Sequence, residues 1–250
     1  DISITGAVGT TTLTSLAAYA NTISVHAVTT TGNQLFTGAG GIALDGNLTS
    51  ITAGDITVNG PATLLSGITV TTKGGDGDDI SFTSTIDNTQ TLTLNAGALG
   101  DVTVTGAIGG TSALTSLSVT NATQVDLNNV KTTGTIGITG TNIDLNGTGY
   151  TSTTAGSIGF TGAVTLVGAG ITVATNGGAI TDDITFTGTI DGGQALTLTA
   201  GGGDISITGT VGTTTLTSLA AYANTISVHA VTPTGNQLFT GAGGIALDGN

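Results

Sequence analysis

The sequence predicts an all-β protein whose strands stack coil upon coil in a parallel β-solenoid, with about 20 residues in each coil. Three observations predict this fold. Residues that favour strands dominate the composition, short apolar pairs recur at a nearly constant spacing, and longer segments of the chain repeat.

Strand-forming residues make up much of the 250-residue chain, in which Ile, Val, Leu and Ala alternate with Thr and Ser. Thr, Val and Ile are stiff at χ1 and fit a pleated surface, whereas the helix formers Glu, Arg and Met are absent. The segment "LTSLAAYA" (residues 13–20) suggests a helix, but helix formers do not flank it, so we expect it to be extended or irregular. A hydrophobic fraction of 38% in this alternating pattern argues against disorder, despite 43 Gly.

Apolar-x-apolar pairs mark the expected strands at steps of about 20 residues. The pairs are Ile2/Ile4, Ile23/Val25, Ile42/Leu44, Ile80/Phe82, Val102/Val104, Val125/Leu127, Ile143/Leu145, Ile184/Phe186 and Ile205/Ile207. Two wider gaps contain Ile56/Val58 and Ile158/Phe160 at a less regular spacing.

Stacking of these pairs would build the core. Successive side chains on a strand point to opposite faces, so each pair places two apolar side chains on the same face. A single coil cannot bury its inward residues alone. We therefore expect Ile2, Ile23 and Ile42 to lie one above another in a continuous apolar column.

The chain also repeats over a distance of 203 residues. Residues 1–47 and 204–250 differ only at Ala7 against Thr210 and at Thr30 against Pro233. Packing would tolerate far more drift on the outer face than this, so the near-identity indicates a recent duplication. We expect the chain to be part of a longer tandem array.

Weaker matches at offsets of 100 to 104 residues divide the 203-residue unit into two diverged halves. One of them pairs "DDISFTSTIDNTQTLTL" at Asp78 with "DDITFTGTIDGGQALTL" at Asp182. The expected organisation is one continuous solenoid segment over residues 1–250, with repeat units 1–100, 101–203 and 204–250. The last unit is a truncated copy of residues 1–47.

Tandem β-sandwich domains of about 100 residues are the alternative architecture. The sequence has no Pro-rich linker between its halves and no Trp to fill an inter-sheet core. The spacing of about 20 residues also has no role in a sandwich. These features favour the solenoid.

Charge and composition limit the partners. The net charge is −13, with no Arg and only Lys73 and Lys131, so we expect neither nucleic acid nor anionic membrane as a partner. No run approaches the roughly 20 apolar residues that span a bilayer, and we expect no membrane insertion. The absence of Cys fits an extracellular protein, although proteins of the cytosol can also lack it.

Four aspartates, Asp76, Asp78, Asp79 and Asp101, are candidate calcium ligands. "GGDGDDISF" (residues 74–82) partly matches the nonapeptide of calcium-binding β-rolls, but its apolar Ile80 falls one place early. Asp79 and Asp101 each precede an apolar pair in neighbouring coils, where Ca²⁺ would relieve the repulsion between their carboxylates. The alternative is that each aspartate caps backbone N–H groups at a turn. We predict no other cofactor.

No catalytic constellation is discernible, and we expect no enzymatic activity. His26 and its copy His229 fall on the outward face of a strand without a Ser or Cys partner pattern. A polysaccharide lyase would need a basic residue to abstract a proton, and Lys73 and Lys131 lie in different expected loops and do not recur.

Thr occupies many outward positions, as in "ITVTT" and "VTVTG". A flat ladder of Thr is a feature of ice-binding solenoids, which makes ice binding an alternative function. Thr is also the β-branched residue that a solvated strand face prefers. The ladder is interrupted by Ser24, His26, Ala43 and Asp126.

The rhythm of "DITFTGTIDGGQALTLTAGGGDISITG" (residues 183–209) resembles the Gly/Thr/Asp-rich β-strand repeats of large secreted bacterial surface proteins, including filamentous-haemagglutinin-like adhesins. The resemblance implies a right-handed parallel β-helix at the cell exterior, as part of a stalk, fibre or adhesin. Separately from the resemblance, we expect neighbouring copies of the chain to associate end to end through unpaired coils.

Overall fold

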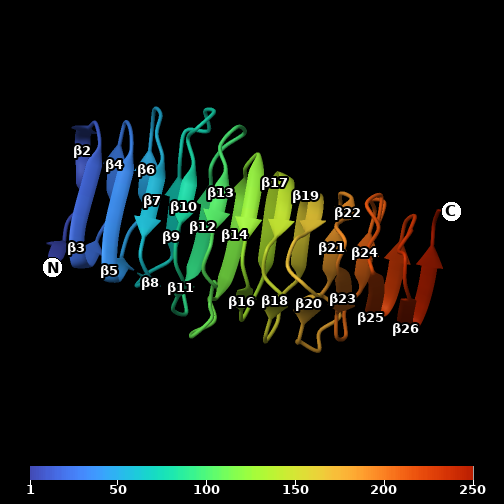
Figure 1. The fold of residues 1–250 in the computed structure, drawn as a ribbon. Helices are drawn as coiled ribbons and strands as arrows, with labels where there is room; N and C mark the ends of the chain where they lie inside the picture. Colours follow the sequence, from blue (N-terminus) through green and yellow to red (C-terminus); the bar gives the residue numbers. More distant parts are fainter. Residues whose placement is uncertain (250) are drawn as a thin grey trace. The chain divides into compact units, whose positions relative to one another are not determined.

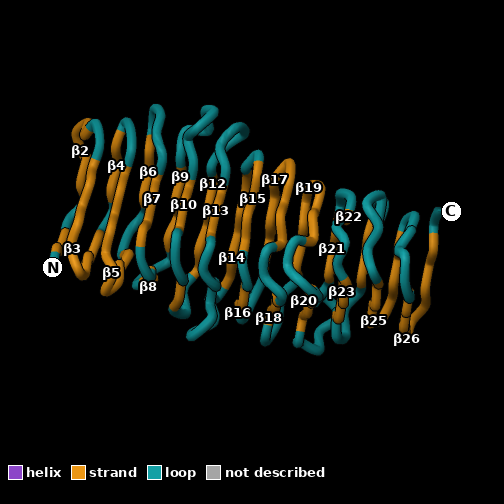
Figure 2. The backbone as a smooth tube through the Cα atoms, in the orientation of Figure 1, coloured by secondary structure: helices purple, strands orange, loops and turns teal. Residues whose placement is uncertain are grey.

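The computed structural model describes residues 1–249, and strands are the only regular elements among them (Figures 1 and 2). The strands run parallel and stack as a β-solenoid of about 11 turns, with roughly 22 residues in each turn. The predicted fold class is therefore confirmed, with coils slightly longer than the apolar pairs alone suggested. Residues 13–20, expected to be extended or irregular, lie largely in strands β2 (Val8–Leu13) and β3 (Leu16–Val25).

The chain divides into two compact units, Asp1–Asp126 and Leu127–Asn250. The remaining strands of the first unit are β1 (Ile2–Ile4), β4 (Val28–Thr30), β5 (Gln34–Leu44), β6 (Leu48–Ser50), β7 (Ile56–Asn59), β8 (Ala62–Leu64), β9 (Ile68–Thr71), β10 (Ile80–Phe82), β11 (Ile86–Asp87), β12 (Thr91–Asn95), β13 (Val102–Val104) and β14 (Ser116–Asn121). The unit boundary falls within β15 (Gln124–Leu127).

The second unit also consists of short strands joined by turns. They are β16 (Val130–Thr132), β17 (Ile136–Leu145), β18 (Gly149–Ser152), β19 (Ile158–Leu166), β20 (Ile171–Thr175), β21 (Ile184–Phe186), β22 (Ile190–Asp191), β23 (Ala195–Thr199), β24 (Ile205–Ile207), β25 (Ser218–Val228) and β26 (Gln237–Leu247). As in the first unit, the strands pair in parallel with strands of the neighbouring coil.

Aliphatic side chains stack in register inside each unit. Ile2 pairs with Ile23 and Ile23 with Ile42, which confirms the predicted column. Alternation along β3 and β5 turns these side chains inward and the intervening Ser24 and Ala43 outward. Ile23 and Ile42 are at most 2% exposed, so burial of the column is nearly complete where a coil lies on both sides.

The irregular pair Ile56/Val58 belongs to a second column, in which Ile56 lies between Gln34 and Ile80. Strand β5 is 11 residues long and is covered by two strands of the next coil. Ile56 lies against Gln34 at its beginning, whereas Ala62 lies against Ile42 near its end. The spacing of the apolar pairs did not predict this arrangement. Gln34 is polar and Ala62 is small, so neither was recognised as the partner of a large aliphatic residue.

Strand β19 of the second unit is shared in the same way. Ile158 pairs with Ile184 of β21, and Val164 pairs with Ile190 of β22. Large rings fill the space between coils here. Phe160 and Phe186 stack with ring centroids 4.8 Å apart, and Tyr150 meets Phe160 edge-on at 6.2 Å.

Corners inside long strands, where the register shifts, bring main chains close together, which explains part of the glycine content. Gly162 has φ of +134°, and a Cβ added there would lie 1.8 Å from the carbonyl oxygen of Gly140 in the neighbouring coil. Only glycine fits such a position without distortion.

Among residues 1–249 no helix is long and apolar enough to cross a membrane.

Candidate functional site

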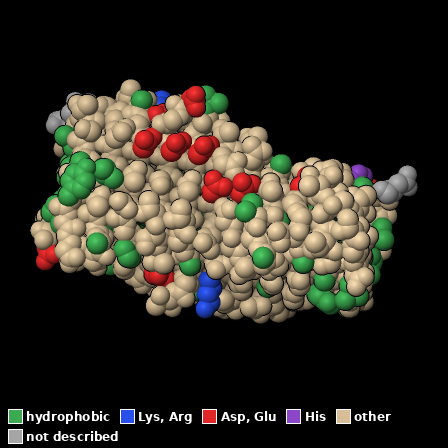
Figure 3. Space-filling view, viewed as in Figure 1, with side chains coloured by type: hydrophobic (Ala, Val, Ile, Leu, Met, Phe, Trp, Pro, Cys, Tyr) green, Lys and Arg blue, Asp and Glu red, His purple; other side chains and the backbone are tan. Residues whose placement is uncertain are grey.

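A ladder of side-chain oxygens runs across successive coils of the first unit, at the turn that precedes each inward strand. Asp55 N donates to Asn33 Oδ1 at 3.2 Å, and Asp79 N donates to Asp55 Oδ1 at 3.2 Å. The next steps are Asp101 N to Asp79 Oδ1 at 2.8 Å and Gln124 N to Asp101 Oδ1 at 2.9 Å. Each carboxylate therefore accepts the main-chain N–H of the matching residue in the next coil. Figure 3 shows carboxylates following one another in a short row on the face in view.

The second unit contains the same ladder. Asp204 N donates to Asp183 Oδ1 at 2.8 Å, and Asp204 Oδ1 accepts from Thr225 N at 2.9 Å and Asn224 Nδ2 at 3.1 Å. The hydroxyl and then the N–H of Thr225 lower the pKa of Asp204 from its usual value of 3.8. These hydrogen bonds therefore stabilise the ionised form of the Asp204 carboxyl group.

The four candidate calcium ligands fall into three different environments. Asp79 and Asp101 lie in adjacent coils, as predicted, and belong to the ladder. Asp76 is exposed in a turn. Asp78 is 5% exposed, and its Oδ1 and Oδ2 accept from Gly54 N at 2.6 Å and Gly75 N at 2.7 Å.

These contacts are those of the capping alternative, in which a carboxylate satisfies backbone N–H groups that a turn leaves without partners. Asp182, the counterpart of Asp78, accepts from Gly156 N at 2.8 Å and Ala179 N at 2.9 Å. Over the described part of the chain no three His, Cys, Asp or Glu side chains are grouped as a metal site. Calcium binding stays a prediction, and calcium titration followed by thermal melting tests it.

The columns of outward-facing side chains contain more than one type of residue. Thr29, Thr49 and Thr71 form one run of three threonines across neighbouring strands. A second column places Thr57, Ser81 and Thr103 in register, and Leu35 lies beside Thr57 in the same column. Ice binding stays a prediction that an ice-recrystallisation assay tests, and the run of three threonines is where a flat ladder is best developed in the first unit.

His26 follows β3 and is half-exposed, in agreement with its predicted outward position. Its Nδ1 lies 3.7 Å from Asp45 Oδ2, with both side chains about half exposed, so a pair between them is screened by solvent. Asp45 was not predicted as the neighbour of His26. A spacing of 19 residues, close to that of one coil, was the available signal.

A column of buried hydroxyl groups lies inside each unit and was not predicted. Thr30, Ser50 and Thr72 are at most 3% exposed. Gln34, also buried, donates from Nε2 to Thr49 O at 2.9 Å and to Thr30 Oγ1 at 3.2 Å.

The matching hydroxyls of the second unit are those of Thr132, Ser152 and Thr175, all at most 1% exposed. Each of these residues ends a tripeptide, such as "VKT" or "YTS", whose first side chain is apolar and faces inward. Because side chains alternate between the two faces of a strand, the third side chain must face inward too. The signal was present, but only aliphatic side chains had been assigned to the core.

Tyr150 is buried completely, in contrast to Tyr19, which is 65% exposed. Its hydroxyl donates to Leu127 O at 2.7 Å and accepts from Gly147 N at 3.1 Å. Burial raises the pKa of Tyr150 well above its usual range, because the phenolate would lose its hydration. The hydroxyl therefore stays protonated and joins one coil to the next.

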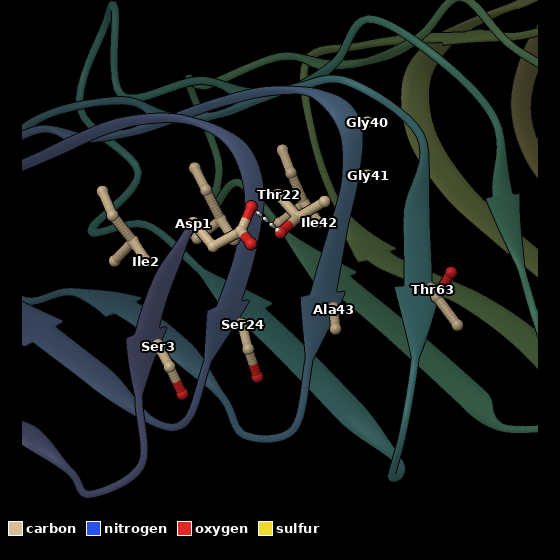
Figure 4. Close-up of a pocket in the computed structure, with 11 residues that line it drawn as sticks. Asp1, Ile2, Ser3, Thr22, Ser24, Gly40, Gly41, Ile42, Ala43 and Thr63 are labelled. Carbon is tan, nitrogen blue, oxygen red and sulfur yellow. Dashed lines mark hydrogen bonds between the residues drawn. The ribbon is translucent and has the colours of Figure 1, made fainter.

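An open concavity of about 420 Å³ lies over β1, β3 and β5 (Figure 4). Asp1 and Thr22 lie side by side in its lining, with Thr22 Oγ1 donating to Asp1 Oδ1 at 2.7 Å. Ser3, Ser24 and Ala43 line its side in register. The small side chains and the single carboxylate offer few groups that could hold a ligand in one orientation.

No protein-family model, no curated protein and no solved structure matches the chain.

Proposed function

We propose that the chain is a structural, non-enzymatic segment of a long extracellular fibre, stalk or adhesin built from tandem repeats. The in-register aliphatic columns are the observation that carries this proposal. The inward side chains of one coil contact the same positions of the next coil, so further coils can be added without a new kind of contact.

The repeated sequence forms the same pair of long strands in both of its positions. Leu16 pairs with Gln34 in β3 and β5, and Leu219 pairs with Gln237 in β25 and β26. Both pairs of strands shift register at the same place, after Ala20 and after Ala223. A tandem array requires this property, because each copy must specify its own coils without help from a distant cap.

Charge supports separation of neighbouring fibres. Residues 1–203 contain 13 Asp and two Lys, a net charge of −11. At a stacking distance of about 4.8 Å per coil, charges this dense lie within the screening length of about 8 Å at physiological salt. Fibres of this kind should repel one another sideways while their ends remain free to associate.

An extracellular location is the part of the proposal that rests most on the resemblance to secreted surface repeats. The absence of Cys and the Thr- and Asp-rich exterior support it, since neither needs a reducing compartment. Detection of the chain on intact cells by antibody labelling, without permeabilisation, tests the location separately from the assembly.

Light scattering over a range of protein concentrations tests the structural role. We expect the mean mass to rise with concentration, and concentrated aligned samples to diffract at the spacing of about 4.8 Å between stacked strands. A chain that remains monomeric at high concentration would contradict the proposal.

Two substitutions that introduce a charge distinguish association of copies through their ends from association through their sides. Leu247 is 63% exposed on β26, and Ile180 is 79% exposed in a turn between β20 and β21. We expect Leu247→Asp to abolish the rise in mass and Ile180→Asp to leave it unchanged. The reverse result would indicate that copies associate through their sides.

A further inference from the structure

Two serine hydroxyl groups lie inside the protein without a hydrogen-bond partner among the described residues. Ser50 and Ser152 are 1% and 0% exposed, and the Oγ atom of neither contacts a protein donor or acceptor. The side-chain oxygen Oε1 of Gln34, which is 1% exposed, also has no partner. A buried polar group without a partner destabilises a fold, so these atoms indicate a ligand that the protein itself does not supply.

In the first unit, Ser50 lies between two threonines of the buried hydroxyl column. Thr30 is its register partner on one side. Thr72 lies on its other side, because Thr49 and Thr71, which precede Ser50 and Thr72 in the chain, are register partners. Three hydroxyl groups from neighbouring coils therefore face the same part of the interior.

Ser152 occupies the same place in the second unit. It is the register partner of Thr132 in β16 and of Thr175 in β20. The order Thr, Ser, Thr is thus the same in both halves of the 203-residue repeat, although the halves have diverged elsewhere. The two serines without partners are one feature of the fold that occurs twice.

The threonines on either side of each serine have already used their protons. All four hydroxyl groups donate to main-chain carbonyl groups of nearby turns. The bonds are Thr30 Oγ1 to Gly32 O, Thr72 Oγ1 to Asp78 O at 2.6 Å, Thr132 Oγ1 to Gly134 O at 2.6 Å and Thr175 Oγ1 to Asp182 O at 2.7 Å. Each threonine oxygen can still accept a hydrogen bond but has no second proton to donate.

The spacing of the coils determines what can join these groups. Strands of adjacent coils lie about 4.8 Å apart, which is too far for a direct bond between two hydroxyl oxygens of one column. One oxygen atom at about 2.8 Å from each of them spans this distance. The ligand must accept the serine proton and donate a proton to a threonine oxygen. Water does both, whereas a metal cation has no proton to donate.

We propose that Ser50 and Ser152 each bind a structural water molecule that joins neighbouring coils inside the protein. The water accepts a hydrogen bond from the serine O–H and donates one to a threonine Oγ1 of the same column. These two sites hold the interior of each coil stack together and do not depend on association between copies of the chain.

Gln34 adds a third ligand to the water in the first unit. Its Nε2 donates to Thr30 Oγ1 at 3.2 Å and to Thr49 O at 2.9 Å, so its amide group lies beside the strand that carries Ser50. The second proton of the water is then donated to Gln34 Oε1. This bond gives the amide oxygen the partner that the protein does not provide.

The second unit has no amide group at the corresponding position. Ile136 follows Thr132 at the same distance in sequence as Gln34 follows Thr30, and it is buried. Ser152 and its two threonine neighbours supply the ligands there. Three polar groups are within the range that buried water molecules typically contact.

A high-resolution crystal structure of the natural chain locates the water molecules. We expect an oxygen peak at about 2.5–3.0 Å from both Ser50 Oγ and Ser152 Oγ. The absence of a peak at both serines would overturn the proposal. A peak at Ser50 alone would overturn the second site and show that the Gln34 amide is required.

The melting temperatures of Ser50→Ala and Ser152→Ala test the same sites in solution. If water is bound, each substitution removes one hydrogen bond, and we expect the melting temperature to fall by about 2–4 °C. If the hydroxyl group has no partner, its removal relieves an unsatisfied polar group and the melting temperature should rise. A rise, or no change, in both variants would overturn the proposal.

Alanine fits the column, so these variants should fold. Ala200 lies in the place after Thr175, because Ala174 and Thr199 are register partners, and it is completely buried. Ser81→Ala is the matched control, since Ser81 faces outward on β10 between Thr57 and Thr103. We expect Ser81→Ala to leave the melting temperature nearly unchanged, and a fall equal to that of Ser152→Ala would assign the effect to strand propensity and overturn the bound water.

Discussion

At the scale of the residue, the aspartates act as caps for the main chain of neighbouring coils. Asp79 and Asp101 of the ladder and the buried Asp78 all accept main-chain N–H groups. A carboxylate in such a position is worth more to the fold than a neutral acceptor, because hydrogen bonds to charged groups are stronger. This explains why these three positions, which precede strands, carry aspartate.

Asp78→Ala should destabilise the fold, whereas Asp76→Ala should not. Loss of the Asp78 carboxylate leaves the N–H groups of Gly54 and Gly75 without their acceptor, at a cost of about 2–3 kcal/mol. Asp76 is an exposed neighbour in the same turn, and its loss should change the unfolding free energy by less than about 0.5 kcal/mol. Urea denaturation of both variants provides the comparison, and equal effects would contradict the capping role.

Acid should remove the contribution of Asp204. Its folded-state pKa is lower than the usual 3.8, so its stabilisation is present above pH 3.8 and is lost as the pH falls through the folded-state pKa. The difference in unfolding free energy between the natural chain and Asp204→Asn should therefore shrink below pH 3.8. Denaturation curves from pH 7 to pH 2 measure it.

Asp248→Asn is the matched control for this pH dependence, because Asp248 is exposed after β26 and its substitution removes the same charge. If Asp204→Asn and the natural chain lost stability in parallel down to pH 2, the assignment of this effect to Asp204 would be wrong.

At the scale of the element, strand pairing depends on corners where two main chains almost touch. The strands supply the aliphatic columns, but the coil closes only where glycine permits positive φ and close approach. Strand β19 contains one such position at Gly162, next to Gly140 of β17. The glycine content is therefore partly a requirement of the coil and not a sign of flexibility.

Gly162→Ala should cost roughly 2 kcal/mol or more, because alanine is strained at φ of +134° and its Cβ would overlap Gly140 O. Gly137→Ala in β17 is the matched control, since no atom lies within 4 Å of a Cβ added there. We expect Gly137→Ala to be neutral or slightly stabilising. Thermal melting distinguishes the two variants, and a neutral Gly162→Ala would mean that this corner rearranges freely.

At the scale of the whole chain, burial depends on which coil lies next to a residue. Strands β5 and β26 have the same sequence but differ in exposure, because a further coil lies against β5 and none lies against β26. The 203-residue repeat thus provides internal controls in which composition and strand geometry are held constant.

Leu44→Ala and Leu247→Ala use this control directly. Leu44 is buried completely, so its truncation should cost about 2–5 kcal/mol of unfolding free energy. Leu247 is 63% exposed, and its truncation should cost less than about 1 kcal/mol in dilute solution. Similar losses for both variants would show that β26 is covered in solution even at low concentration.

Sequence alone determined the fold class, the column of Ile2, Ile23 and Ile42, and the placement of Asp79 and Asp101 in adjacent coils. These follow from two-residue alternation and from the distance between repeats, which are properties of the sequence itself. Only the tertiary structure decided that β5 carries two columns, that Gln34 points inward, and that Asp78 is buried. The physical reason is that coil length varies at the corners, so the residue opposite any given strand position depends on how the intervening turn closes.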